Sequence, residues 1–183
     1  MTAVLHGFPV ARVDYPRAPP ALLDRGVALR PAGEADLAWL RALYAETRAE
    51  ELAIVPWDPQ VKQAFLDSQF DLQHRHYLTH FGQADYLVIE EHTRPIGRLY
   101  LLREPPAFRV IDIALSASAR CHGTGSALIS DIQKQAAALG YGVVLQVDSR
   151  NHNARRLYER LGFLATEPGD SHVPMSWGAS TLS

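Results

Sequence analysis

Short runs in which hydrophobic and polar residues alternate are separated by longer stretches with a helical period. Val27 to Arg30 alternates as a strand does, and residues 85–104 predict two strands joined by a polar turn at residues 92–94. The pattern places further strands at residues 108–116, 141–148, 163–168 and 172–177. The chain is therefore expected to build a sheet of several strands.

Apolar residues at helical spacing mark the stretches between these strands. Leu37, Leu40 and Tyr44 share one face of a first helix. Asp58 can cap a second helix that begins at Pro59. One face of this second helix is expected to carry Val61, Phe65, Leu72 and His76. Two more helices are predicted at residues 123–140 and 152–162.

The order of these elements indicates the fold class. A strand, two helices, three strands, a helix, a strand, a helix and two strands together predict an α/β domain with a mixed sheet. Residues 1–26 hold four of the twelve prolines and show no clear periodicity. We interpret them as an extended arm that packs on the domain or on a partner chain, or that stays poorly ordered. The domain is expected at residues 27–178, followed by a tail at residues 179–183.

Composition and charge exclude several classes of protein. The chain has 183 residues, 47% of them hydrophobic, which suits one domain with a sizeable core. Its net charge of -2 lacks the basic excess of a nucleic-acid-binding protein. The single cysteine, Cys121, excludes an internal disulfide and a cysteine-rich zinc site. With no signal peptide and no apolar run near the roughly 18 residues of a membrane helix, a cytoplasmic protein without a membrane partner is expected.

Two glycines stand where a strand gives way to a helix, in "SASARCHGTGSALISDIQKQAAALG". Gly123 and Gly125 remove Cβ atoms and permit positive φ, so that backbone N–H groups can converge on an anion at the helix N-terminus. Arg120 adds a positive charge. The alternative is an ordinary strand-to-helix turn, because neither of the two familiar nucleotide-binding glycine motifs is present.

A second motif follows the next predicted strand, in "VVLQVDSRNHNARRLYERLGF". It consists of Asn151, Ala154, Leu157, Tyr158, Gly162 and Phe163. Together with Arg-x-x-Gly-x-Gly, this motif resembles the signature of the GNAT superfamily of acetyl-CoA-dependent N-acetyltransferases. The resemblance, over about residues 27–178, implies a mostly antiparallel, twisted mixed sheet of about seven strands flanked by about four helices. It also implies a splayed parallel strand pair that holds the cofactor.

The resemblance further implies a binding site for acetyl-CoA. The backbone of Ile113 and Leu115 is expected to hydrogen-bond the pantetheine arm, and Asn151 is expected to reach the cofactor from the last helix. The residues expected to cradle the pyrophosphate are Arg120, Cys121, His122, Gly123, Thr124, Gly125 and Ser126. Cys121 beside His122 also suits a catalytic nucleophile, but in the family such positions face the phosphates through their backbone.

A primary amine is expected to attack the thioester directly in a ternary complex, so that no covalent nucleophile is needed. An N–H near Leu115 could stabilise the developing oxyanion. The resemblance places the hydroxyl of Tyr158 near the sulfur, where it can donate a hydrogen bond to the leaving thiolate as well as protonate it. Asp112 is the candidate general base, with Glu90 and Glu91 as rivals.

Other candidates concern the acceptor and the alternative functions. His76 and His80 are one helical turn apart, but no HExxH motif accompanies them, so no metal is expected and a histidine-metal hydrolase is the weakest alternative. The acceptor pocket is expected to include Glu51, Trp57, His76 and Tyr77. The acceptor is a small amine, or a protein N-terminal or lysine amine; whether the acyl group is longer than acetyl stays open.

Two further questions stay open. A non-catalytic acyl-CoA-binding module would keep the glycine loop, although the presence of Tyr158 and Asn151 argues against it. Homodimerisation is compatible with the N-terminal arm and the last strand.

Overall fold

Seven strands form one mixed sheet in the computed structural model, which describes residues 7–166 and 171–178. The order across the sheet is β1-β2-β3-β4-β5-β7-β6, and all neighbours are antiparallel except β4 and β5. The strands are β1 (Val27–Pro31), β2 (Asp85–Glu91), β3 (Arg94–Glu104), β4 (Ala107–Leu115), β5 (Gly142–Asp148), β6 (Leu164–Ala165) and β7 (His172–Trp177). This confirms the predicted mixed sheet with one parallel pair; the tail at 179–183 lies outside the described residues.

Within the described residues, six α-helices surround the sheet, where about four were expected. They are α1 (Pro20–Leu23), α2 (Leu37–Thr47), α3 (Ala49–Ala53), α4 (Pro59–His80), α5 (Thr124–Ala138) and α6 (His152–Arg160), with single 3-10 turns at Glu34–Asp36 and Ala117–Ala119. The additional helices, α1 and α3, span four and five residues. Segments this short do not complete a periodic pattern, which is why the sequence does not predict them.

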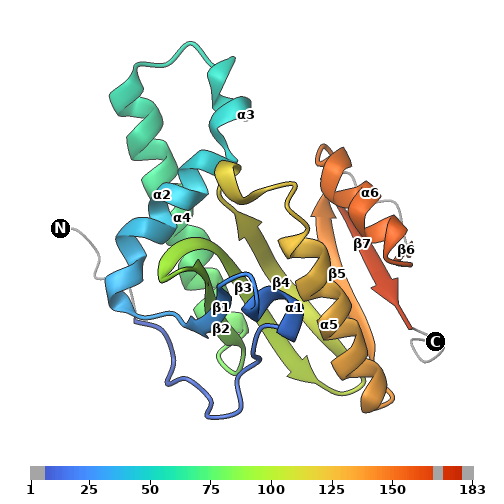
Figure 1. The fold of residues 1–183 in the computed structure, drawn as a ribbon. Helices are drawn as coiled ribbons and strands as arrows, with labels where there is room; N and C mark the ends of the chain where they lie inside the picture. Colours follow the sequence, from blue (N-terminus) through green and yellow to red (C-terminus); the bar gives the residue numbers. More distant parts are fainter. Residues whose placement is uncertain (1–6, 167–170, 179–183) are drawn as a thin grey trace.

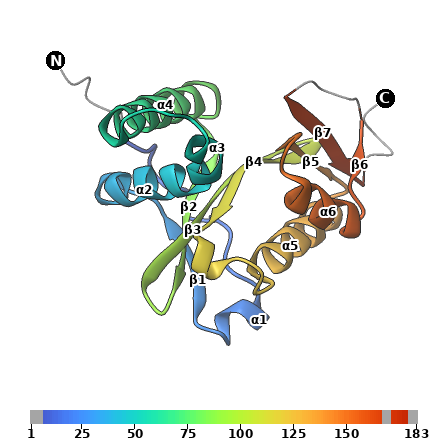
Figure 2. The same cartoon turned by 90° about the horizontal axis from the view of Figure 1, so that it is seen from above.

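Different helices cover the two faces of the sheet (Figures 1 and 2). Leu99 and Leu101 of β3 point to the face covered by α5, where they join the largest apolar cluster with Ile129. Tyr100, between them, points to the opposite face, toward α4. The alternation of side chains along β3 therefore separates an apolar core from a second, partly polar layer.

Helix α4 turns a different face inward from the one its apolar pattern suggests. Leu66, Phe70 and His74 are its buried residues. Val61, Phe65 and Leu72 are 53%, 40% and 50% exposed. The helix carries apolar residues on two sides, and packing against α2 selects the side of Phe70. The sequence pattern alone does not distinguish between the two sides.

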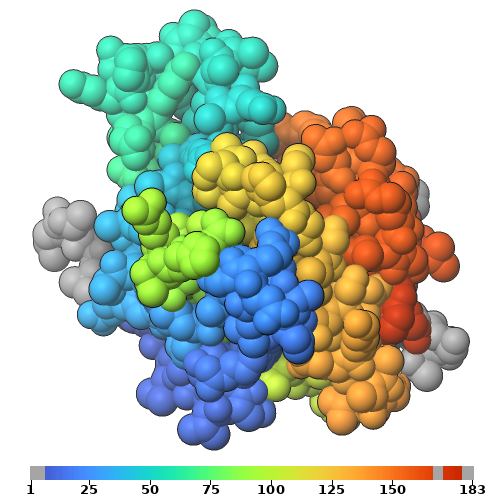
Figure 3. Space-filling model, in the orientation of Figure 1, coloured from blue at the N-terminus to red at the C-terminus, as the bar shows by residue number. Residues whose placement is uncertain are grey.

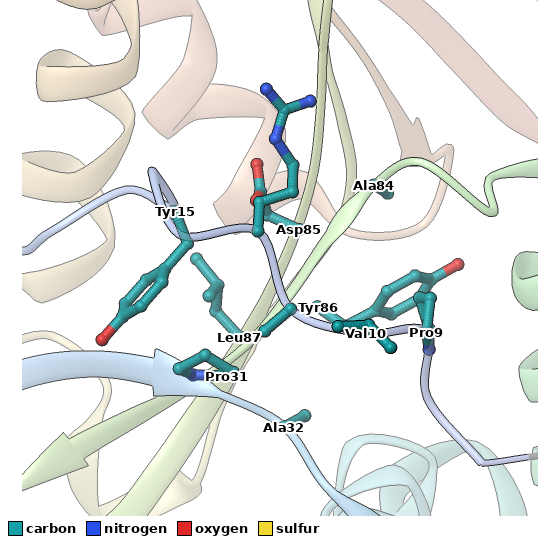
Figure 4. Close-up of a pocket in the computed structure, with 11 residues that line it drawn as sticks. Pro9, Val10, Tyr15, Pro31, Ala32, Ala84, Asp85, Tyr86 and Leu87 are labelled. Atoms are coloured by element: carbon teal, nitrogen blue, oxygen red, sulfur yellow. The ribbon is translucent and has the colours of Figure 1, made fainter.

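The described part of the N-terminal arm packs on its own domain. The ring of Phe8 lies 4.9 Å from His74 and 5.5 Å from Tyr86, centroid to centroid. Arg103 donates to the backbone oxygen of Asp14 and forms an ion pair of 2.6 Å with buried Asp85. A small pocket remains between the arm and strands β1 and β2, and it includes none of the predicted site residues (Figure 4).

The surface carries one clear projection. Helix α3 and the adjoining end of α4 stand out from the rest of the molecule (Figure 3). Among the described residues, no helix is both long enough and apolar enough to cross a membrane.

Candidate active site

The parallel strands β4 and β5 separate part-way along their length. They pair from Ala107 and Gly142 as far as Val110 and Leu145. Beyond that point β4 continues for five residues, to Leu115, and β5 for three, to Asp148, without pairing with each other; β4 still pairs with β3, and β5 with β7. A bulge in β4 opposite Tyr100 and Leu101 of β3 accompanies the separation. Peptide groups on the side of β4 that faces β5 are therefore available to a ligand in this gap.

The glycine loop follows β4 directly. Gly123 adopts φ 80° at the N-cap of α5, and no side chain caps this helix. A Cβ built on Gly123 meets nothing within 4 Å, so the left-handed backbone rather than crowding requires the glycine. The first-turn N–H groups of α5 have no intrahelical acceptors. The loop thus has the form expected for an anion site, and the structure fits the pyrophosphate of acetyl-CoA here.

Two other contacts hold this loop in place. Arg120 donates from Nε to the backbone oxygen of Leu115 at 2.9 Å. Glu46, on α2, accepts a hydrogen bond of 2.6 Å from the backbone N–H of Ala117. Cys121 is exposed and has φ 64°. Because the sequence gives no signal for a contact between segments so far apart, Glu46 was not predicted.

Helix α6 carries the second motif to the other side of the gap. The side chain of Asn151 accepts a hydrogen bond of 3.0 Å from the N–H of Ala154 and so caps the helix. Tyr158 is buried and packs against Phe163, with ring centroids 5.7 Å apart. Burial, with a smaller effect of Asp112, raises the pKa of Tyr158 to about 12. The phenol therefore stays protonated at neutral pH and remains a hydrogen-bond donor.

Asp112 belongs to a buried polar cluster on the α4 side of the sheet. Its Oδ2 accepts hydrogen bonds from Arg98 at 2.7 Å and from the hydroxyl of Tyr77 at 3.1 Å. Arg98 also donates to Gln73 at 3.0 Å, and its side chain is only 4% exposed. Burial and then Asp112 raise the pKa of Tyr77 far above its usual value, so its hydroxyl remains a donor. Oδ1 of Asp112 has no partner among the described residues.

The rival carboxylates lie elsewhere. Glu90 forms an ion pair of 2.6 Å with Arg30, which also binds Asp36. Glu90 and Glu91 end β2, which is separated from β4 by the whole of β3. Of the three acidic candidates, Asp112 is therefore the one that lies on a strand of the gap.

The four residues predicted for the acceptor pocket have separate surroundings. Tyr77 contacts Asp112, and Glu51 lies 3.4 Å from Arg150, at the end of β5. Trp57 is partly exposed and packs against Phe65 beyond α3. His76 stacks near His80, with ring centroids 4.2 Å apart. No group of three potential metal ligands occurs within residues 7–166 and 171–178.

Several charged residues near the gap were not singled out from the sequence. They are Arg48, Arg98, Asp148 and Arg150, together with Glu46. Arg98 carried a signal, since it is a charged residue inside the otherwise apolar run of β3. The others lie in exposed segments, where charge is ordinary.

One protein-family model matches a stretch of the chain that includes both the glycine loop and the motif on α6. The model described as "Acetyltransferase (GNAT) family" matches residues 40–163. The chain belongs to the GNAT acetyltransferase family. It is therefore an acyltransferase of the acetyl-CoA-dependent N-acetyltransferase type. No curated protein sequence matches this GNAT chain.

Solved structures share the GNAT fold at low sequence identity. The PaiA N-acetyltransferase of Thermoplasma acidophilum, in complex with coenzyme A, is 15% identical with a TM-score of 0.62, covering 82% of this chain and 98% of that one. RimL, a ribosomal L7/L12 alpha-N-protein acetyltransferase, is 18% identical with a TM-score of 0.59, covering 92% and 97%. A spermidine N-acetyltransferase chimera from Vibrio cholerae and hSSAT is 19% identical with a TM-score of 0.56, covering 83% and 95%.

Proposed function

We propose that this GNAT enzyme transfers acetyl from acetyl-CoA to a primary amine by direct attack in a ternary complex. The observation that carries the proposal is the gap between β4 and β5. Asp112 lies on β4 beyond the last pair, and Tyr158 lies on α6, where Asp112 contributes to its raised pKa. A primary amine can attack the thioester directly, so the proposal requires no covalent nucleophile from the protein.

The backbone of Ile113 and Leu115 holds the pantetheine arm in this proposal, because both residues lie beyond the last β4–β5 pair. The carbonyl oxygen of Leu115 already accepts a hydrogen bond from Nε of Arg120, so it is not part of this contact. The loop from Arg120 to Ser126 offers its N–H groups to the pyrophosphate. The amide nitrogen of Asn151 stays available because the cap uses only its oxygen. When bound, acetyl-CoA supplies an activated acyl group to the amine.

Two side chains manage the protons of the reaction. Asp112 accepts a proton from the acceptor ammonium through Oδ1, directly or through water, while Arg98 and Tyr77 hold Oδ2. Tyr158 donates a hydrogen bond to the departing thiolate, which its raised pKa permits at neutral pH. A backbone N–H near Leu115 stabilises the charge that develops on the acyl oxygen.

The ion pairs near the gap bear on how many amino groups the acceptor carries. Asp112 pairs with Arg98, and Glu51 and Asp148 pair with arginines at the gap's open end. A polyamine needs unpaired carboxylates for its additional cations, and these three are already occupied. The arrangement favours an acceptor with a single amino group, either a small amine or a protein amine.

Calorimetric titration with acetyl-CoA tests the binding site. We expect a micromolar dissociation constant for the wild type. Gly123→Glu should abolish binding, because it forces φ 80° on a non-glycine residue and places a carboxylate where the phosphates lie. Absence of binding to the wild type would overturn the proposed site.

Release of the CoA thiol in the presence of a panel of amines tests transfer. Tyr158→Phe should slow transfer about 100-fold and leave acetyl-CoA binding unchanged. The matched control is Tyr141→Phe, since Tyr141 packs on Phe108 at the opposite end of the sheet from the gap. A protein that binds acetyl-CoA but acetylates no amine would instead be a non-catalytic acyl-CoA-binding module.

A further inference from the structure

Four charged side chains meet across the open end of the gap, and we call them the ion bridge: Arg48, Glu51, Asp148 and Arg150. Arg48 and Glu51 belong to the α2–α3 segment, whereas Asp148 ends β5 and Arg150 follows it. Arg48 lies 3.8 Å from Asp148, and Arg150 lies 3.4 Å from Glu51. Positive and negative groups therefore alternate from one side of the gap to the other.

The two sides of the ion bridge are positioned by the strands themselves. Glu46, near the end of α2, binds the N–H of Ala117, just beyond the end of β4. Asp148 is the last residue of β5, and its Oδ1 accepts from the N–H of Arg150 at 2.9 Å. The bridge thus joins the carboxyl ends of the separated strands. Figure 2 shows α3 and α6 on opposite sides of this opening.

Contacts within each side are shorter than those across the gap. Arg48 donates to Glu51 at 3.2 Å, and Arg150 donates to both oxygens of Asp148, at 3.2 and 3.0 Å. The contacts across the gap, at 3.8 and 3.4 Å, are ion pairs at longer range. If the two sides separate, each arginine keeps its hydrogen-bonded carboxylate. Opening therefore leaves no charge unpaired, which keeps its cost low.

The surroundings of the bridge also favour reversible opening. Its side chains are between 20% and 67% exposed, so water and salt screen the ion pairs across the gap. The base of the gap is held independently by the β4–β5 pairing from Ala107 to Val110. Opening the bridge therefore does not require the two halves of the sheet to come apart.

We propose that the ion bridge is a gate that opens to admit the pantetheine arm between β4 and β5 and closes again over it. The inference rests on the proposed function, because it concerns entry to the same gap. With the bridge closed, the arm has to thread lengthwise beneath it. With the bridge open, the arm enters sideways and reaches the backbone of Ile113 and Leu115 along its whole length.

Stopped-flow measurement of acetyl-CoA association and dissociation tests the gate, with the full chain and a Glu51→Gln variant. This substitution keeps the shape of the side chain but removes Arg150–Glu51, the shorter of the two ion pairs across the gap. We expect both rate constants to rise about threefold, with the dissociation constant unchanged within about twofold. Screening should shrink the difference from the wild type at about 0.5 M salt.

Glu159→Gln is the matched control. Glu159 is an exposed residue of α6 that pairs with Arg155 and has no contact across the gap. The control substitution removes the same charge, so it measures how much a more positive protein attracts the anionic cofactor. A purely electrostatic effect raises the association rate and tightens binding, whereas a gate raises both rates together.

The outcomes separate the two proposals. Acetyl-CoA binding with rates for Glu51→Gln equal to those of the wild type or of Glu159→Gln would overturn the gate and leave the proposed function standing. A faster association rate with tighter binding would also overturn the gate. No binding of acetyl-CoA to the wild type would overturn both.

Discussion

Two groups of ion pairs flank the same gap in opposite environments. The Arg98–Asp112 pair has a distance of 2.7 Å, and its side chains are 4% and 14% exposed. The ion bridge lies at the surface, with longer contacts between its two sides. If one partner of a buried ion pair is lost, the other charge is left without a partner and without water. If an exposed ion pair separates, water solvates each charge. Asp112 is therefore held in a fixed position, whereas the side chains of the ion bridge can separate.

The largest expected effect is on the buried pair. Arg98→Met should lower the free energy of unfolding by about 3–5 kcal/mol, because Asp112 is left buried without its guanidinium. Urea denaturation measures this change. Arg155→Met, on the exposed face of α6, is the control and should change stability by no more than about 0.5 kcal/mol. Equal effects of the two variants would contradict the contrast between buried and exposed pairs.

A double variant separates stability from chemistry. Arg98→Met with Asp112→Leu removes both charges, and it should recover about 2 kcal/mol of the stability lost by Arg98→Met alone. Transfer to amines should be abolished in the double variant, because no carboxylate remains at this position. Recovery of both stability and transfer would show that Asp112 is not the base.

A smaller effect is expected from removing the hydroxyl of Tyr77, which donates a hydrogen bond from α4 to Asp112. Tyr77→Phe should cost about 1–2 kcal/mol, since it deletes one hydrogen bond to a carboxylate and keeps the ring. Tyr86→Phe is the control, because its hydroxyl donates to the neutral backbone oxygen of Phe81 at 3.2 Å. Thermal unfolding measures the stability of both variants, and a greater loss of stability for Tyr86→Phe than for Tyr77→Phe would contradict the prediction.

The smallest expected effect concerns the bridge. Hydrogen bonds from Arg150 lower the pKa of Asp148 from 3.8 to about 2. Ionised Asp148 therefore stabilises the fold above pH 3.8, and this contribution is lost as the pH falls through about 2. Asp148→Asn should cost only about 0.5 kcal/mol at pH 7 after allowance for screening, and nothing once the pH is about one unit below the folded pKa. Unfolding at both values checks this, and a loss that persists at the lower pH would refute it.

Local sequence was enough for the glycine loop and the start of α6. The glycine loop was expected to use positive φ, and Gly123 adopts it at the start of α5. Asn151 caps α6 through Ala154, three residues away. These features depend on contacts within one turn of the chain, so a motif of fixed spacing reports them.

The acceptor side depended on tertiary packing. Helix α4 carries apolar residues on two sides, and contact with α2 decided that Phe70 rather than Phe65 is buried. The short helix α3, which supplies Glu51, has no periodic pattern of its own. Sequence analysis therefore placed Glu51 and Tyr77 near the acceptor but could not say what either would touch.

The sequence by itself determined the family, the order of the strands and longer helices along the chain and the form of the glycine loop, because these follow from side-chain periodicity and from motifs of fixed spacing. Only the tertiary structure decided which charges meet. Tyr77 reaches Asp112 across 35 positions of the chain, and Glu46 reaches Ala117 across 71. Charged residues on exposed segments have many compatible partners in sequence, and only the packing of helices against the sheet selects one.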